Sequence, residues 1–173
     1  MASALSKVTV LVLLSLLSIP GLHALCNPCP FQWLPFGGHC YRLVLETLQW
    51  QEAEKYCQSL PHRRHGPAHL VAINSEEEQQ FLAGYAQVTR QATSFSYFWI
   101  GLNDIDHEGQ YVWVGTSIGE SENQGFRNWI SAGHTYPGHS NYDCALTHSS
   151  HGWKWFQHPC SYRYFFVCEV EQL

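Results

Sequence analysis

The stretch Phe98-Trp99-Ile100-Gly101-Leu102, followed at once by Asn103-Asp104, decides how the rest of the chain is organised. It is an apolar run of strand length, in which aromatic and β-branched residues flank a single glycine. Two amphipathic helical patterns precede the run, and short Trp-rich strands and long polar loops follow it. We therefore expect a central strand that joins a helical half and a loop half of one α+β domain.

The first helical pattern begins after Thr47, the expected N-cap, and ends before Pro61. Apolar residues recur in it at spacings of three and four, whereas Glu52, Glu54 and Lys55 are expected to face solvent. The apolar stripe consists of Trp50, Ala53, Cys57 and Leu60. Since the stripe contains a cysteine, a disulfide can fasten this helix to another element.

The second helical pattern begins at a capping box, in which Ser75 is the N-cap and Glu78 lies three residues further on. Its apolar face is supplied by Phe81, Leu82 and Tyr85, and residues 86–97 are polar enough to predict a connector. Gly37-Gly38 predicts a hairpin turn. Further strands are expected at 69–73, 111–114, 126–130, 153–156 and 164–168, with loops at 115–125 and 131–143.

The composition predicts a well-filled globular protein that binds no nucleic acid. The 173 residues are 45% hydrophobic and only 13% charged, and the net charge of −5 provides no basic face. An enzyme is not expected, because no activated Ser or Cys motif, phosphate loop or His-Glu-x-x-His helix is present.

The N-terminus predicts secretion. Lys7 precedes a ten-residue apolar run at 8–17, and a small-residue cleavage site follows at Ala24. We interpret 1–24 as a signal peptide and 25–173 as the domain. A signal anchor is the alternative, but the run is much shorter than the about 20 residues that span a bilayer. No later stretch is long enough to cross a membrane.

Seven cysteines fit an oxidising, extracellular destination, where they predict disulfides rather than metal thiolates. Six cysteines allow 15 pairings, so spacing alone does not fix the connectivity. A bond between Cys29 and Cys40 would clip the predicted hairpin. The odd number predicts one cysteine for an intermolecular bond.

With these motifs, the chain resembles the C-type lectin-like domain family, and most closely its secreted, long-form, single-domain invertebrate members. The resemblance covers residues 29–171 and rests on Gly38-His39-Cys40-Tyr41, Trp50-Gln51-Glu52-Ala53-Glu54, His69-Leu70-Val71, Asn74-Ser75-Glu76-Glu77-Glu78, Trp99-Ile100-Gly101-Leu102, Glu108-Gly109, Trp113, Asn128-Trp129, Asp143-Cys144, Cys160 and Phe166-Val167-Cys168-Glu169. It implies a disulfide-stapled fold of two helices, short antiparallel strands and long loops.

The resemblance also implies the disulfide pattern. The implied pairs are Cys57–Cys168, Cys144–Cys160 and, as the extra bond of the long form, Cys29–Cys40. Cys26 is then left for an interchain bond in a homodimer, although Cys26 is an alternative to Cys29 in the hairpin bond.

Sugar-binding members of this family hold a primary Ca²⁺ ion with oxygens from a Pro-containing loop tripeptide and a later Trp-Asn-Asp motif, because Ca²⁺ takes 6–8 oxygen ligands. Here the tripeptide is Tyr136-Pro137-Gly138, and the later motif reads Trp155-Phe156-Gln157. Both depart from the pattern, so the usual primary site is not expected. We assign ligand binding to the tripeptide and Gln157, together with Trp153 as a ring that stacks on a sugar.

An auxiliary calcium site is better preserved, because Asp104, Glu108 and Asp143 match three acidic positions that the family uses. An EF-hand loop is excluded there, since Gly115 stands where the final Glu would be. Five histidines also crowd this half of the chain: His134, His139, His148, His151 and His158. They lack a spacing typical of Zn²⁺ ligands, so zinc is not expected.

Two functions follow from the resemblance. The first is a secreted, disulfide-linked lectin that binds cell-surface or microbial glycans, as in innate immunity. The second is a calcium-independent module that presents the same loop face to a protein, mineral or ice surface.

Overall fold

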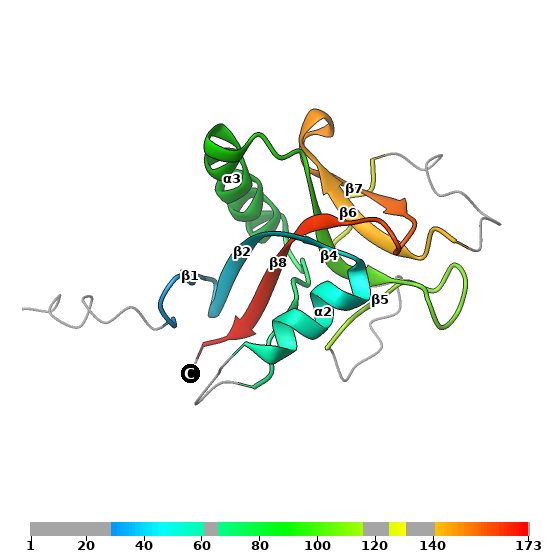
Figure 1. Cartoon of the computed structure of the whole chain (residues 1–173), viewed down its shortest axis with the longest axis horizontal. Coiled ribbons are helices and arrows are strands. Elements are labelled where there is room, and N and C mark those ends of the chain that lie inside the picture. Colours follow the sequence, from blue (N-terminus) through cyan, green and yellow to red (C-terminus); the bar gives the residue numbers. More distant parts are fainter. Residues whose placement is uncertain (1–28, 61–65, 116–124, 131–140, 173) are drawn as a thin grey trace, which may run out of the picture.

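A computed structural model describes residues 29–60, 66–115, 125–130 and 141–172. Its elements are β1 (Leu34–Phe36), β2 (His39–Leu48), α2 (Trp50–Ser59), β3 (His69–Leu70), α3 (Glu76–Thr93), β4 (Tyr97–Asn103), β5 (Val112–Trp113), β6 (Cys144–His148), the 3₁₀ turn η3 (Ser149–His151), β7 (Lys154–His158) and β8 (Tyr164–Glu171). Figure 1 shows the two helices on either side of the strands. This is the α+β arrangement of two helices and a mainly antiparallel sheet that the sequence predicts.

The strands form one sheet with the order β1-β2-β8-β4-β6-β7, to which β3 adds at β8 and β5 at β4. Neighbours are antiparallel, except that β4 runs parallel to β8 through Phe98↔Phe165 and Trp99↔Phe166. The central strand therefore lies beside the C-terminal strand, as Figure 1 also shows. No helix among the described residues is both long and apolar enough to cross a membrane.

The central strand β4 is apolar throughout because both of its faces are covered. Trp99 packs in a cluster with Trp50, Ala53 and Cys57 of α2. Phe98, Ile100 and Leu102 alternate with it and join the opposite cluster, to which α3 contributes Leu82 and Ala86. A strand buried on both faces reads as a continuous hydrophobic run.

Gly101 of β4 lies where another chain segment approaches closely. Its N–H donates to the carbonyl of Val71 at 2.8 Å, and its carbonyl accepts from the N–H of Val114 at 3.0 Å. A Cβ atom at this position would lie 2.7 Å from the Leu70 carbonyl oxygen and 2.9 Å from Val114 Cγ1. Glycine is therefore required for packing between β4 and the chain after β3.

Three disulfides join these elements: Cys29–Cys40, Cys57–Cys168 and Cys144–Cys160. The pairs implied by the family resemblance are confirmed, and Cys29 rather than Cys26 closes the hairpin bond. The hairpin itself turns at Gly37-Gly38, where both residues have positive φ, as a two-residue turn of this kind requires. Cys26 lies outside the described residues.

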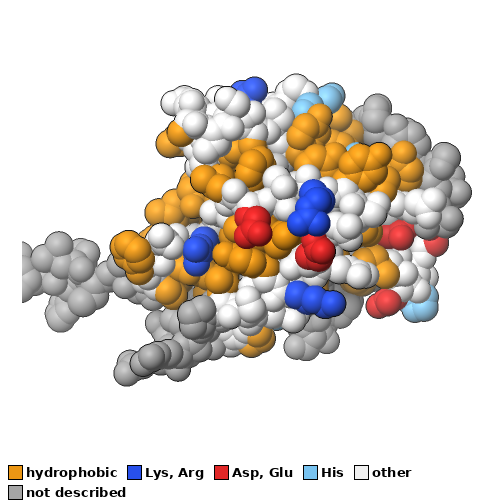
Figure 2. Space-filling model, in the orientation of Figure 1, with side chains coloured by type: hydrophobic (Ala, Val, Ile, Leu, Met, Phe, Trp, Pro, Cys, Tyr) orange, Lys and Arg blue, Asp and Glu red, His pale blue; other side chains and the backbone are white. Residues whose placement is uncertain are grey.

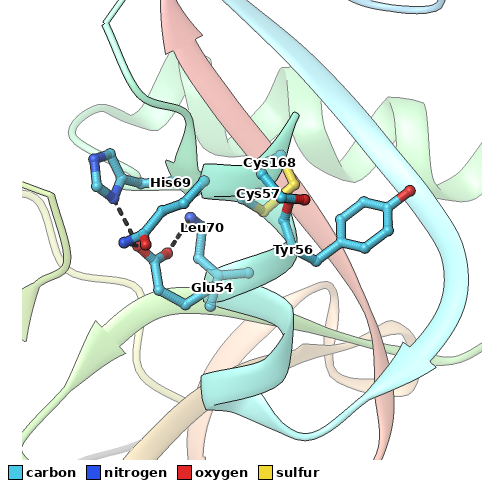
Figure 3. The surroundings of a disulfide bond; sticks show 8 residues. Glu54, Tyr56, Cys57, His69, Leu70 and Cys168 are labelled. Carbon is cyan, nitrogen blue, oxygen red and sulfur yellow. Dashed lines mark hydrogen bonds and ion pairs between the residues drawn. A yellow bond between two sulfur atoms is a disulfide. The ribbon is translucent and has the colours of Figure 1, made fainter. Parts of the chain in front are cut away.

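The first helix was predicted with two errors. Its N-cap is Gln49, because Thr47 still belongs to β2. Glu54 does not face solvent: it is 7% exposed, accepts from Leu70 N–H at 2.8 Å and lies 2.6 Å from His69 Nδ1 (Figure 3). Glu54 follows Trp50 by four residues, so the two side chains lie on the same face of the helix. The carboxylate of Glu54 binds His69 and Leu70 and so holds β3 against α2, next to the Cys57–Cys168 disulfide.

The second helix is longer than predicted. Ser75 is its N-cap and accepts from Glu78 N–H at 3.1 Å, but the Glu78 carboxylate accepts from Asn74 N–H at 2.8 Å instead of closing a capping box. Residues 86–93 are helical and not a connector. The hydroxyls of Thr89 and Thr93 donate to carbonyls four residues earlier, so both polar groups are satisfied within the helix.

Two strand predictions also need correction. The segment 126–130 makes only one isolated bridge, between Trp129 and Trp155. The strand predicted at 69–73 covers only 69–70 as β3. The sequence prediction also missed β6, which lies between β4 and β7 and is buried along nearly its whole length.

A partly buried ionic cluster links β2, β8 and α3. His39 Nδ1 lies 2.6 Å from Glu169 Oε1, and the second oxygen of Glu169 accepts from Ala72 N–H at 2.9 Å. Nearby, Tyr41 Oη donates to Glu78 at 2.7 Å. The hydrogen bond to Glu169 raises the pKa of His39 above its ordinary value.

This cluster predicts a stability that depends on pH. Because the folded state raises the pKa of His39, the favourable pairing is fully present below about pH 6.5 and is lost as the pH rises through the raised value. The His39→Gln variant should therefore melt below the parent, by the largest margin near pH 6 and a smaller one near pH 8.5. Thermal unfolding across this range measures the margin, and a margin that is constant or grows with pH contradicts the assignment.

Candidate functional site

An aromatic cluster surrounds Trp155 of β7. The rings of Trp113, Phe126 and Trp129 meet the ring of Trp155 edge-on, with centroids 5.4, 5.7 and 5.9 Å away. Backbone bonds fix the chain there, since Ile130 N–H donates to the Trp155 carbonyl at 3.0 Å. The chain enters residues 131–140 from this cluster, and the Cys144–Cys160 disulfide lies just beyond them. The predicted contacts Tyr136, Pro137 and Gly138 lie outside the described residues.

Gln157 of β7, predicted to contact a ligand, is 6% exposed. Its amide donates to the hydroxyl of Tyr111, which the sequence analysis did not assign to the site. Burial raises the pKa of Tyr111, and the nearby charge of Asp104 raises it further. The hydroxyl therefore stays protonated, and the described structure gives Gln157 a contact inside the protein.

Phe156 takes the position at which sugar-binding members have a calcium-ligating amide. It is half-buried and packs against the rings of Tyr97 and His148, with centroids 6.2 and 5.9 Å away. A phenyl ring supplies no oxygen ligand. Together with the engaged amide of Gln157, it leaves this strand without the donor set of a primary calcium site.

Trp153 was predicted to lie on the loop face, and this is wrong. The residue is 5% exposed, and its ring packs against Phe95 and Phe98 with centroids 6.0 and 5.6 Å away. Its backbone has φ +60°, directly after Gly152 at +66°. These two left-handed residues turn the tryptophan inward, so it has no free ring face for a sugar.

Of the three predicted calcium ligands, Asp104 and Asp143 lie together. Asp104 is 3% exposed, its N–H donates to the Asp143 carbonyl at 3.0 Å, and its Oδ2 accepts from Gly109 N–H at 2.8 Å. Its Oδ1 is buried without a hydrogen-bond partner. Burial and the charge of Asp104 both raise the pKa of Asp143.

The third predicted acid lies at the surface. Glu108 is exposed, and within 29–60, 66–115, 125–130 and 141–172 no three His, Cys, Asp or Glu side chains converge closely enough to hold an ion. An orphaned carboxylate oxygen and two repelling charges are features that a cation would relieve. Two side chains supply only part of the 6–8 oxygens that Ca²⁺ takes, so the auxiliary calcium site stays a prediction.

Comparison with known proteins agrees with this architecture. A model of the family described as "Lectin C-type domain" matches residues 46–170. Echinoidin of Heliocidaris crassispina is 32% identical over 147 residues, which cover 82% of this chain and 96% of echinoidin. CD209 antigen of Symphalangus syndactylus is 30% identical over 147 residues, but the match covers 84% of this chain and only 34% of that protein.

A solved structure shows the same fold over most of the described chain. The C-type lectin CEL-I from Cucumaria echinata matches with a TM-score of 0.71 and 24% identity, covering 85% of this chain and 100% of CEL-I. The family match spans most of the sequence, and echinoidin is matched over nearly its whole length. This chain therefore belongs to the C-type lectin domain family.

Proposed function

We propose that this protein is a secreted lectin that binds cell-surface or microbial glycans through its long-loop face, without a primary calcium ion. Membership of the C-type lectin domain family supports carbohydrate binding. The observation that carries the calcium-independent mode is the state of β7, where Phe156 offers no oxygen and the amide of Gln157 is bound to Tyr111. Recognition of microbial glycans is a task of innate immunity.

The glycan contacts are assigned to the loop tripeptide Tyr136-Pro137-Gly138. An aromatic ring stacks on the apolar face of a pyranose, and the tyrosine hydroxyl adds a donor and an acceptor. The aromatic cluster around Trp155 ends at Ile130, the last described residue before this segment, and a rigid element at that point is the usual support of a binding loop. Trp153 and Gln157 are not included, since both side chains are buried.

A second candidate function is a calcium-independent interaction module for a protein, mineral or ice surface. The state of Phe156 and Gln157 on β7 favours this function too, because a strand without calcium ligands lacks the groups by which the family usually binds sugars. The long-loop face would then dock on its partner by shape and hydrogen bonds.

A glycan array probed with the untagged, disulfide-intact protein separates the two functions. The lectin assignment predicts reproducible binding to a restricted set of glycans, and Tyr136→Ala should reduce it. Tyr162→Ala is a matched control, since this exposed tyrosine lies on the turn before β8. An array without any bound glycan contradicts the lectin function and leaves the interaction module.

Secretion and dimerisation are further parts of the proposal. Residues 1–24 direct export, and Cys26 joins two chains, because the other six cysteines pair within the chain. Two linked domains engage neighbouring glycans with higher avidity than one.

The dimer predicts a simple gel result. The parent should migrate at twice the monomer mass without reductant and at the monomer mass with it, whereas Cys26→Ser should be monomeric in both. A parent that is monomeric on the non-reducing gel rules out the interchain bond.

A further inference from the structure

The turn between β6 and β7 brings three side-chain donors to one point. His148 Nδ1 and His151 Nδ1 lie 2.7 Å apart, and Ser150 Oγ lies 2.7 Å from the first and 3.1 Å from the second. The residues come from the end of β6 and from η3, which the αL residue Gly152 closes. Figure 2 shows histidine side chains at the surface along the upper edge of the molecule, next to hydrophobic ones, and Figure 1 places the β6–β7 turn there.

The packing around the turn holds the donors in place. The ring of His148 is half-buried and stacks on Tyr97 with centroids 4.2 Å apart and an interplanar angle of 21°. Backbone bonds fix both ends of the turn, since Ser149 N–H donates to the Ser96 carbonyl and Trp153 N–H to the His148 carbonyl, each at 2.9 Å. His151 and Ser150 are exposed, so the open side of the group faces solvent.

The two imidazoles present a lone pair to the shared space. Two N–H groups cannot point at each other across 2.7 Å, so at least one of the Nδ1 atoms is unprotonated when both rings are neutral. The neutral imidazole is the form that ligates metals.

We propose that His148 and His151 bind a divalent transition-metal ion, Zn²⁺, with Ser150 Oγ or water as a further donor. Two nitrogen ligands of a tetrahedral Zn²⁺ ion lie about 3.3 Å apart when each bond is about 2.05 Å. The exposed His151 therefore moves outward by less than 1 Å, while His148 stays stacked on Tyr97. Imidazole donors select Zn²⁺ or Cu²⁺ over Ca²⁺, which prefers hard oxygens.

The site differs from those that the family resemblance implies. It uses nitrogen donors on the β6–β7 turn rather than oxygens of the long loop, and its two histidines lack the His-x₃-His spacing by which a zinc site is recognised in a sequence. With two histidines, it leaves coordination positions open to solvent or to an external ligand. The nearby positive charge of Arg90 opposes a cation, so binding is weaker than in a structural zinc site.

Calorimetric titration of the untagged, disulfide-intact protein with ZnCl₂ near pH 7.5 tests the site. The parent should bind Zn²⁺ saturably. His151→Gln, which removes one ligand, should lose one site or bind about tenfold more weakly. Arg90→Gln, which removes the repelling charge, should bind Zn²⁺ more tightly than the parent. His107→Gln is the matched control, because His107 is also exposed but lies in the turn after β4. Its affinity should equal that of the parent.

Two further readouts identify the ligands. Zn²⁺ should shift the imidazole NMR signals of His148 and His151, and binding should weaken below about pH 6 as protons compete. Unchanged Zn²⁺ binding in His151→Gln, or no saturable binding in the parent, overturns the proposal. Since the test uses no glycan, its outcome is independent of the lectin function.

Discussion

Replacing Gly101 by alanine should destabilise the protein by about 3 kcal/mol or more, the upper end of what overpacking a core costs. The new methyl group would lie 2.7 Å from the Leu70 carbonyl oxygen and 3.2 Å from that of Val71. Backbone atoms on the neighbouring segment cannot rotate away, so β4 and β3 must separate. Chemical unfolding of purified protein measures the loss, which should also appear as a lower yield of folded protein.

Gly84→Ala is the matched control, because it adds the same methyl group where nothing lies within 4 Å. Gly84 is inside α3, where alanine is favoured over glycine by up to about 1 kcal/mol. The two substitutions should therefore change stability in opposite directions. A Gly101→Ala variant as stable as the parent would show that β3 does not constrain the central strand.

Removing the Cys57–Cys168 disulfide by two alanines should cost about 4–5 kcal/mol, enough to unfold many domains of this size at body temperature. The bond links α2 to β8 across a sequence separation of 111 residues, so its loss greatly increases the freedom of the unfolded chain. Both cysteines are fully buried, and their removal also empties space between α2 and the sheet.

The Cys29–Cys40 bond provides the comparison, since it closes a separation of only 11 residues. Its removal should cost about 3 kcal/mol and leave the sheet intact. Urea unfolding of both double variants gives the two values. If the short-range bond proved the more costly, the chain-entropy explanation would be wrong, and strain or packing would have to replace it.

The central strand shows why the sequence predicts the fold well. Its apolar run predicts a buried strand, its single glycine predicts a close approach of another segment, and the apolar stripe on the first helix predicts the surface that covers it. All three predictions fit one arrangement. The same holds for Gly37-Gly38, whose positive φ angles are those of a two-residue hairpin. Consistent local signals of this kind identify an element without knowledge of its neighbours.

Other features depend on contacts that the sequence does not show. Strand β6 is a short, buried segment without alternation, so only its pairing with β4 and β7 identifies it. Glu54 can be buried because its carboxylate accepts a hydrogen bond from Leu70 N–H and pairs with His69, and these partners are at least 15 residues away. The C-terminal half of α3 is mostly polar, so its sequence alone gives no helical apolar stripe, although the backbone continues as a helix to Thr93.

The candidate site was predicted less well than the fold. Trp153 has a left-handed backbone that glycine favours, and the sequence gives no sign that a tryptophan adopts it and turns inward. The acidic pair was anticipated in part, because Asp104 and Asp143 do meet, but Glu108 stays at the surface. The proximity of His148 and His151 follows from the η3 turn, which the sequence analysis did not predict.

Under the proposed function, the long-loop face would bind glycan without a primary calcium ion, because β7 carries Phe156 and an engaged Gln157. Calorimetry of the best glycan from the array, in excess Ca²⁺ and in excess EDTA, tests this most directly. The account predicts dissociation constants that agree within about twofold, less than 0.5 kcal/mol. A loss of about tenfold or more in EDTA, recovered when Ca²⁺ is restored, would contradict it.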